Sequence, residues 1–371
     1  MSGPWVDGAM PYRAPRWLVG GNAQTIWPAL FAKRFDGPRP SYRRERWTAP
    51  DADFIDVDWL DGGPGSAGAP TAPAEEALPA SGRPGAGLAR TAVSPSVETP
   101  LLVLFHGLEG SSASHYAQAF AHWARGRGWR FAVPHFRGCS GPPNLAPRAY
   151  HSGDHEEIGW MLQRFRALHR GPIAAVGISL GGNALLRWAE EAGDAAAGCA
   201  GAIAAISSPI DLTASGRAIG RGFNRQVYTR MFLRTMKARA LVKLAQHPGL
   251  FDRERMLAAR TLYEFDNVFT APLHGFKDTD DYWSRGSAKP HLARIRIPAL
   301  VLNARNDPFV PARSLPHARE VGRCVTLWQP AHGGHVGFPG GRWPGHVHTL
   351  PEHVGGWLAG HLVDAEGRAG R

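Results

Sequence analysis

The sequence predicts an α/β fold in which helices flank a mostly parallel central sheet and a helical lid is inserted between two strands. From Pro100 onwards, short apolar runs alternate with segments of helical spacing, which is typical of parallel βαβ units with right-handed crossovers. The alternation stops between residues 211 and 296 and then resumes. Hydrophobic residues make up 43% of the 371 residues and charged residues 20%, so the chain can bury a sizeable core.

The N-terminal segment, residues 1–61, is expected to supply the first strands, because DFIDVDWL alternates polar and apolar residues as a strand does. Residues 62–99 are rich in Gly, Ala, Pro and Ser and contain few bulky apolar groups. Such a segment cannot bury enough surface to offset the entropy of ordering it. We therefore expect a disordered insertion on the surface, between two strands.

Residues 100–210 form the first part of the predicted core. Apolar runs that end in glycine or a turn are expected to be strands, and the capped segments with a period of 3.6 residues between them helices. The expected strands contain PLLVLF, WRFAVP, GPIAAVG and AGAIAAI, and the expected helices contain SHYAQAFAHWARG, HEEIGWMLQRFRAL and GGNALLRWAEEA.

The rest of the chain is expected to contain the lid and the second part of the core. Residues 211–296 hold Arg-rich helical material and an irregular aromatic stretch, which we assign to a lid over the carboxyl edge of the sheet. Residues 297–363 resume the alternation with two strands and a last helix that carries Pro351 in its first turn. Residues 364–371 are expected to be a flexible tail.

The formal net charge of +11 raises the possibility of nucleic-acid binding. Lysine occurs at only five positions, however, and the arginines are scattered through apolar segments without a long basic run. We therefore attribute the excess to arginine-rich residue usage and expect no nucleic-acid partner. Contact with an anionic membrane surface, as a peripheral lipid contact, stays open as the alternative.

Cysteine usage and the absence of long apolar stretches indicate the compartment. The three cysteines, Cys139, Cys199 and Cys324, are widely spaced, which excludes a disulfide framework and a Cys-rich zinc module and fits a reducing compartment. The N-terminus contains no apolar region typical of a signal peptide, and no stretch reaches the roughly 18 apolar residues of a membrane span. We expect a soluble, cytoplasmic protein.

The strongest functional signal is the GxSxG pattern Gly177-Ile178-Ser179-Leu180-Gly181. A lone pentapeptide of this kind is weak evidence in a Gly-rich chain. Here it lies between an expected strand and an expected helix, which is the context of a nucleophile elbow. The helix N-terminus would place free N–H groups beside the serine. Ser179 is therefore the candidate nucleophile.

A serine hydroxyl needs a base oriented by an acid, and in α/β-hydrolases both follow the serine in the chain, on loops after later strands. Asp307 directly follows the strand PALVLNARN. Two histidines, His332 and His335, follow the strand VTLWQ. The glycines before His335 favour it as the base, and His332 remains the alternative.

An acyl-transfer site also needs donors for the oxyanion. We expect the N–H of Leu180, directly after the serine, and the N–H of Leu108 in the loop HGLEG after an expected core strand. His106 in the same loop is expected to be structural. No carboxylate or cysteine completes a metal site with the histidines at 346, 348 and 353, so we expect surface histidines, no metal site and no cofactor.

Together these motifs resemble the YheT-like branch of the α/β-hydrolases, the AB hydrolase 4 family, which includes the ABHD-type esterases. The resemblance spans nearly the whole chain apart from residues 62–99 and the tail. Its motifs are FHGLEGSS, FRGCSGPPNLAPRAYHSGD, GISLGGNALLRW, NARNDPF and GGHVGF, with QTIWPAL and LHGFKDTDDYW also fitting. It implies a triad of Ser179, Asp307 and His335, so it selects His335 over His332, and it implies activity on carboxylic esters of acyl chains.

We therefore expect a serine hydrolase of the carboxylesterase or acylglycerol-lipase type, acting on a small-molecule acyl ester. Acyl transfer to an alcohol or thioester cleavage on the same triad is the first alternative. An alternative of another class is a catalytically silent protein that uses the fold for binding. An epoxide- or haloalkane-type hydrolase is disfavoured, because such enzymes place aspartate where this chain has Ser179.

Overall fold

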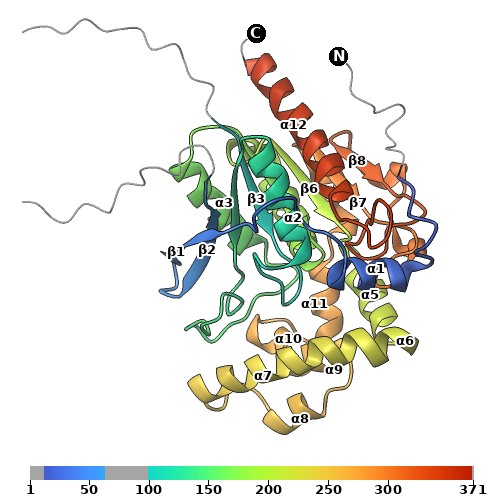
Figure 1. Cartoon of the computed structure of the whole chain (residues 1–371). Coiled ribbons are helices and arrows are strands. Elements are labelled where there is room, and N and C mark those ends of the chain that lie inside the picture. The colour runs from blue at the N-terminus through green and yellow to red at the C-terminus, as the bar shows by residue number, and fades with distance from the viewer. Residues whose placement is uncertain (1–11, 63–98, 370–371) are drawn as a thin grey trace, which may run out of the picture.

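An eight-stranded sheet forms the centre of the computed structural model, which describes residues 12–62 and 99–369 (Figure 1). The strand order is β1-β2-β4-β3-β5-β6-β7-β8. All neighbours from β4 to β8 run parallel, while β1–β2 and β2–β4 are antiparallel. The strands are β1 (Tyr42–Thr48), β2 (Phe54–Leu60), β3 (Leu101–Phe105), β4 (Arg130–Pro134), β5 (Ile173–Ile178), β6 (Ala202–Ile206), β7 (Ala299–Leu302) and β8 (Val325–Trp328). The predicted α/β class with a mostly parallel sheet is confirmed.

Strand β2 is buried at every position although its sequence alternates. Its polar residues Asp56 and Asp58 are covered by the edge strand β1. Arg46 donates to Asp56 and Arg44 to Asp58, each at 2.7 Å through Nε. A buried carboxylate is tolerated when it is paired in this way, so both faces of the strand can be covered.

Helices cover both faces of the sheet, as the alternation predicts. Helix α2 packs against the last helix, α12, on one face, and α3 packs against α4 on the other. Because both faces of the parallel strands are covered, their sequences are continuous apolar runs. The bounds of these helices are α2 (His115–Gly126), α3 (His155–Leu168), α4 (Leu180–Ala192) and α12 (Thr349–Ala369).

The segment between β6 and β7 is almost entirely helical, and most of it lies beyond the carboxyl ends of the parallel strands (Figure 1). We call residues 211–296 the helical insertion. Its longest helical stretch runs from Gly222 to Gln246, with one π-helical turn at Arg225–Thr229. The elements are α5 (Leu212–Ile219), α6 (Gly222–Asn224), α7 (Arg230–Gln246), α8 (Arg253–Ala258), α9 (Leu262–Val268), α10 (Thr270–Leu273), α11 (Thr279–Gly286) and a 3₁₀ turn at Lys289–Arg294.

Two terminal features complete the description. A short N-terminal helix, α1 (Gly21–Leu30), lies beside the helical insertion (Figure 1). Helix α12 continues to Ala369, through most of the segment that we expected to be a flexible tail. The predicted disordered insertion at 62–99 falls almost wholly on residues 63–98, which lie outside the described residues. No helix in the described ranges is long and apolar enough to cross a bilayer.

Candidate active site

Ser179 lies at the turn between β5 and α4, with backbone angles φ 52° and ψ −117°. A positive φ is uncommon for a residue other than glycine and is typical of strained functional turns. Two backbone hydrogen bonds hold the turn. The Ser179 N–H donates to the carbonyl of Ile206, at the end of β6, at 2.8 Å, and the Gly182 N–H donates to the Ser179 carbonyl at 3.0 Å. The strand–turn–helix context that the GxSxG motif requires is therefore present.

The two glycines of the motif are required by close backbone approach. A Cβ added to Gly177 would lie 2.4 Å from the Cα of Gly182. A Cβ added to Gly181 would lie 2.5 Å from the carbonyl oxygen of His106. Both separations are far inside van der Waals contact, so a side chain at either position would displace the backbone around Ser179.

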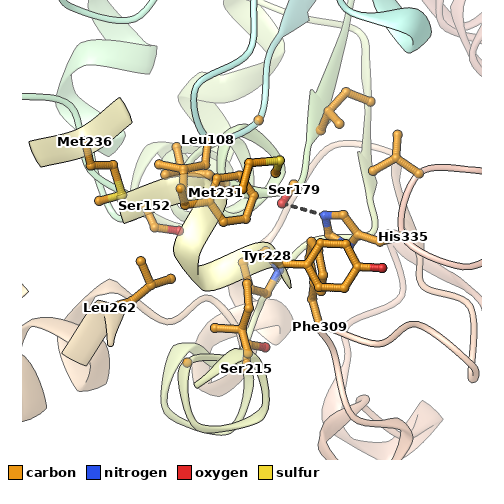
Figure 2. A pocket seen from close by; sticks show the side chains of 18 of the residues that line it. Leu108, Ser152, Ser179, Ser215, Tyr228, Met231, Met236, Leu262, Phe309 and His335 are labelled. Carbon is orange, nitrogen blue, oxygen red and sulfur yellow. Dashed lines mark hydrogen bonds between the residues drawn. The ribbon is translucent and has the colours of Figure 1, made fainter. Parts of the chain in front are cut away.

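The His335 ring lies between Ser179 and Asp307 (Figure 2 shows the Ser179–His335 bond). Its Nε2 is 3.0 Å from Ser179 Oγ and its Nδ1 is 2.9 Å from Asp307 Oδ2. With the proton assigned to Nδ1, the imidazole donates to the carboxylate and accepts from the serine hydroxyl. The Asp307 carboxylate is buried, and its other oxygen accepts from the N–H of Phe309 at 2.7 Å.

The alternative base, His332, lies on the same loop but points elsewhere. Its side chain is exposed, and its Nδ1 lies 3.5 Å from Nδ2 of Asn306. The structure thus brings three of the predicted residues together, Ser179, Asp307 and His335, and leaves His332 outside this chain of hydrogen bonds.

Helix α1 holds the loop that carries His335, which sequence reasoning missed. The His335 N–H donates to the Thr25 hydroxyl at 2.9 Å, and the Gly333 N–H donates to Gln24 Oε1 at 2.9 Å. Asn306, next to Asp307, also donates to Gln24 Oε1, at 2.8 Å. The only signal in the sequence was that QTIWPAL fits the family resemblance, which says nothing about what these side chains contact.

The two predicted oxyanion donors border Ser179. Leu180 is the first residue of α4, so its N–H has no partner within the helix. Leu108 lies in the loop after β3, and a Cβ added to its neighbour Gly107 would lie 3.2 Å from the Ser179 Cβ. Across the described residues, the Leu108 N–H has no hydrogen-bond partner, whereas the N–H groups of Gly107 and Glu109 both have one.

The loop around Leu108 is fixed by two tyrosines, Tyr116, which is buried, and Tyr150, which is partly buried. The Gly107 N–H donates to the Tyr116 hydroxyl at 3.1 Å. The Tyr150 hydroxyl accepts from the Glu109 N–H at 3.0 Å and donates to the Glu109 carboxylate at 2.9 Å. Burial raises the pKa of Tyr150 well above its ordinary value, so the hydroxyl keeps the proton that it donates. On the side of the helical insertion, Arg239 Nε lies 3.2 Å from the second Glu109 oxygen.

His106 is fully buried beneath this loop. Its Nδ1 lies 2.8 Å from the Gly107 carbonyl oxygen, and its Nε2 accepts from the Phe136 N–H at 3.1 Å. Burial lowers the pKa of His106 to about 3, so the ring stays neutral. These contacts agree with the structural role expected for it.

Ser179 and His335 open onto a cavity of about 510 Å³. The walls come from α1, the loop after β3, and helices α5, α7, α9 and α11 of the insertion. Most of the lining side chains are apolar; they include Ile26, Leu30, Leu108, Leu212, Ile219, Val227, Met231, Phe232, Met236, Leu262 and Trp283. Figure 2 labels Leu108 and Met231 among the lining side chains, and the Phe309 ring centroid lies 4.2 Å from that of His335. Such a lining suits the hydrocarbon part of a substrate.

One carboxyl group also lines this cavity. Asp266 accepts hydrogen bonds from the Thr270 hydroxyl at 2.6 Å and the Trp283 indole at 2.9 Å. Burial raises the pKa of Asp266 to about 6, although both hydrogen bonds act in the opposite direction. Asp266 therefore holds its proton to a higher pH than an ordinary aspartate does.

Away from the cavity, Asp36 supplies a carboxylate that the sequence does not connect with the histidines. Ligand-type atoms of Asp36, His122 and His348 lie within 4.8 Å of one another. The Asp36 carboxylate is exposed and forms an ion pair with Lys33. Because the ammonium group already neutralises this carboxylate, we assign no metal to the cluster.

Comparison with known proteins places these features in one family. Residues 100–341 match the family model described as alpha/beta hydrolase fold. The Escherichia coli (strain K12) protein named "Putative esterase YheT" is 36% identical over 345 residues, which cover 92% of this chain and 91% of that protein.

Two eukaryotic relatives match at lower identity. Human "Phospholipase ABHD3" is 26% identical over 88% of this chain and 73% of its own length. The "Monoacylglycerol lipase" of Saccharomyces cerevisiae is 28% identical over 66% of this chain and 57% of its own length. The elbow at Ser179, the sheet topology and these matches agree, and the chain therefore belongs to the α/β-hydrolase family, in its YheT-like branch.

Proposed function

We propose that this protein is a serine hydrolase that cleaves carboxylic esters of acyl chains. The relatives named esterase, phospholipase and monoacylglycerol lipase support ester cleavage as the reaction class. The observation that carries the proposal is the hydrogen-bonded series Ser179–His335–Asp307, which opens onto an apolar cavity of about 510 Å³.

In the first half of the reaction, Ser179 Oγ attacks the ester carbonyl carbon. His335 Nε2, 3.0 Å away, takes the hydroxyl proton as the new C–O bond forms. Asp307 keeps the other ring nitrogen protonated and stabilises the imidazolium. The protonated His335 then gives its proton to the leaving alcohol as the ester bond breaks, which leaves an acyl-Ser179 ester.

The negative charge that develops on the carbonyl oxygen is taken by backbone donors. Leu180 N–H lies at the positive end of α4, and Leu108 N–H has no competing partner in the described part of the chain. Each preorganised donor of this kind contributes about 10²- to 10³-fold to kcat. Tyr116 and Tyr150 hold the Leu108 loop in place before substrate arrives.

In the second half, water replaces the alcohol. His335 takes a proton from the water as it attacks the acyl carbon, and then returns the proton to Ser179 Oγ as the acid leaves. The acyl chain lies among the apolar side chains of the cavity throughout. Apart from the ester and water, every group in this mechanism belongs to the chain.

Covalent labelling with a fluorophosphonate probe tests the proposal, because such probes react only with an activated serine. Wild-type protein should gain one adduct, and Ser179→Ala should gain none. Ser215→Ala is the matched control, since Ser215 lines the same cavity and is buried; it should label like wild type. Labelling that survives in Ser179→Ala, or no labelling of folded wild-type protein, would contradict the proposal and favour the binding alternative.

A further inference from the structure

Exposed apolar side chains gather at two edges of the cavity mouth. Of the twelve large hydrophobic side chains that are exposed within residues 12–62 and 99–362, eight lie on these edges. The α1 edge consists of Trp17, Val19, Leu30, Phe31 and Trp343, and the insertion edge consists of Phe223, Val227 and Met231. Exposed apolar groups scattered singly need no explanation, but a contiguous group of them marks an interaction site.

The three aromatic side chains of the α1 edge surround Trp27, which is partly buried. The Trp27 ring centroid lies 4.6 Å from that of Phe31, 5.8 Å from that of Trp17 and 6.4 Å from that of Trp343. The indole N–H of Trp27 donates to the Pro344 carbonyl at 2.8 Å. The rings are therefore held in place while their outer faces stay open, and 70% of Trp343 is exposed.

The insertion edge is a stripe along one helical stretch. Phe223, Val227 and Met231 are four residues apart on Gly222–Gln246, so they lie on the same side of it. Arg221, Arg230 and Arg234 are exposed around them. An apolar stripe bordered by arginines is typical of helices that lie on a membrane surface.

The two edges border one opening. Leu30 of the α1 edge and Val227 and Met231 of the insertion edge are exposed and also line the cavity that contains Ser179. The Tyr228 hydroxyl and Asn22 Oδ1 join the two edges by a hydrogen bond of 3.0 Å. A molecule that contacted both edges would therefore have direct access to the cavity.

The positive charge of the chain is concentrated in the same two segments. Residues 12–35 and 212–251 together contain 12 of the 42 Lys and Arg residues and none of the 31 Asp and Glu residues. The remainder of the chain holds 30 of the former and 31 of the latter and is nearly neutral. Not all twelve face an open surface, because Lys243 is buried and Lys33 and Arg239 are paired with Asp36 and Glu109. The exposed cations of these segments that have no acidic partner among the described residues are Arg13, Arg16, Arg217, Arg221, Arg230 and Arg234. Arginine-rich residue usage does not explain this separation of charge, so these arginines mark a surface for an anionic partner.

We propose that this mouth surface docks on an anionic phospholipid bilayer, with the aromatic and aliphatic side chains at the headgroup level and the arginines around them on the lipid phosphates. The inference rests on the proposed function and extends it, because it names where the enzyme meets its acyl ester. Each cationic side chain near an anionic membrane adds about fivefold to binding, and tryptophan favours the membrane–water interface.

A lipid surface fits these observations better than a nucleic acid does. Val19, Leu30, Val227 and Met231 are aliphatic or thioether side chains with no stacking or hydrogen-bonding partner in a nucleic acid. The acyl region of a bilayer accepts them without cost. The opening between the two edges also leads into an apolar cavity, which a nucleic acid would leave empty.

Vesicle co-sedimentation of the full chain tests the proposal. Wild-type protein should bind vesicles of phosphatidylglycerol and phosphatidylcholine at least tenfold more strongly than vesicles of phosphatidylcholine alone, and added salt should weaken this binding. The double variant Arg230→Gln/Arg234→Gln should lose about 30-fold in binding. Phe31→Ser/Trp343→Ser should lose a similar factor by removing apolar contact, and neither pair lines the cavity.

Matched controls come from the opposite edge of the sheet. Leu168 is exposed at the end of α3, just before the amino end of β5, and Arg323 is exposed just before β8. Leu168→Ser and Arg323→Gln should bind vesicles like wild type. Ser179→Ala should also bind vesicles like wild type, although it should hydrolyse no ester. Vesicle binding by this variant therefore tests docking independently of the proposed hydrolase function.

The two double variants should affect hydrolysis of a soluble ester and hydrolysis of a membrane-embedded ester differently. Hydrolysis of the soluble ester p-nitrophenyl acetate should stay within about twofold of wild type in both double variants, while hydrolysis of a monoacylglycerol embedded in anionic vesicles should fall about tenfold or more. Equal binding of wild type to neutral and anionic vesicles, or equal losses in the control variants, would overturn the proposal. If wild-type protein bound duplex DNA more tightly than the vesicles, and the arginine variant lost this DNA binding, the proposal would be overturned in favour of a nucleic-acid partner.

Discussion

The backbone N–H of His335 donates a hydrogen bond of 2.9 Å to the hydroxyl of Thr25, a residue 310 positions earlier in the chain. The N-terminal helix α1 thus holds the loop that presents His335 to Ser179. Since catalytic geometry tolerates little displacement, we expect this contact to position the proposed base.

Thr25→Val keeps the side-chain shape but removes the acceptor for the His335 N–H. We expect kcat to fall about tenfold to 10²-fold with KM nearly unchanged, since the base is displaced and the cavity wall is kept. The free energy of unfolding should fall by about 1 kcal/mol, because a partly buried N–H loses its partner. Thr25→Ser retains the hydroxyl and should recover most of kcat; equal losses in both variants would show that packing, not the hydrogen bond, matters.

Substitutions of the two histidines on the loop after β8 should affect the rate of ester hydrolysis very differently. His335→Ala should lower kcat by about 10³-fold or more with KM little changed, and its effect should not add to that of Ser179→Ala. His332→Ala should cost about tenfold at most, through loop geometry alone. Steady-state kinetics on a p-nitrophenyl ester measure both. The reverse ranking would move the base to His332.

The Leu108 loop should depend on the Tyr150 hydroxyl. Tyr150→Phe removes the acceptor for the Glu109 N–H and the donor to the Glu109 carboxylate, so the loop loses two of its hydrogen bonds. We expect kcat to fall about tenfold to 10²-fold, with a smaller change in KM, because an oxyanion donor acts mainly in the transition state. A large rise in KM at constant kcat would assign Tyr150 to substrate binding instead.

The stability of the protein should carry a pH dependence from Asp266. Its folded pKa of about 6 lies above the unfolded value near 3.9, so its contribution to stability is fully present below about pH 4 and is lost as the pH rises through 6. Between pH 5 and pH 8 this loss amounts to about 1.5 kcal/mol. The side chain of Asp266→Asn cannot ionise. In urea unfolding, the free energy of unfolding of the variant should therefore increase relative to that of wild type by this amount as the pH rises from 5 to 8. Parallel pH profiles of the two proteins would contradict the expectation.

Most of residues 62–99 should be dispensable. Strand β2 ends at Leu60 and β3 begins at Leu101, and both lie at the same edge of the sheet with only β4 between them. Two strand spacings amount to about 10 Å, which a linker of about six residues spans. Replacing 64–97 by such a Gly/Ser linker should leave the melting temperature and ester hydrolysis nearly unchanged. A large loss of either would show that the segment packs on the fold.

Features encoded by contiguous sequence could be predicted, and those that depend on distant contacts could not. Ser179 was predictable because a strand, a glycine-flanked serine and a helix follow one another directly. The choice between His332 and His335 was left open by spacing, since their three-residue separation on one loop does not fix direction. The side chains of Gln24 and Thr25 give that loop its direction, and no local pattern links them to it.

The distribution of charge and the burial of β2 also could not be predicted from the sequence. The arginines looked scattered along the chain, yet folding brings α1 and residues 212–236 to one opening. Strand β2 alternated as if one face met water, but Arg44 and Arg46 of the neighbouring strand cover its aspartates. Both outcomes depend on which segments become neighbours in space, which the linear pattern does not contain.

The most direct test of the account is the site of the acyl-enzyme. Wild-type protein mixed with an excess of a p-nitrophenyl ester and quenched rapidly should carry one acyl group, and peptide mass spectrometry should locate it on Ser179. The burst of p-nitrophenol should equal the enzyme concentration when deacylation is the slower step. His335→Ala should form the same adduct about 10³-fold more slowly. An adduct on any residue other than Ser179, or no adduct although deacylation is the slower step, would contradict the proposed mechanism.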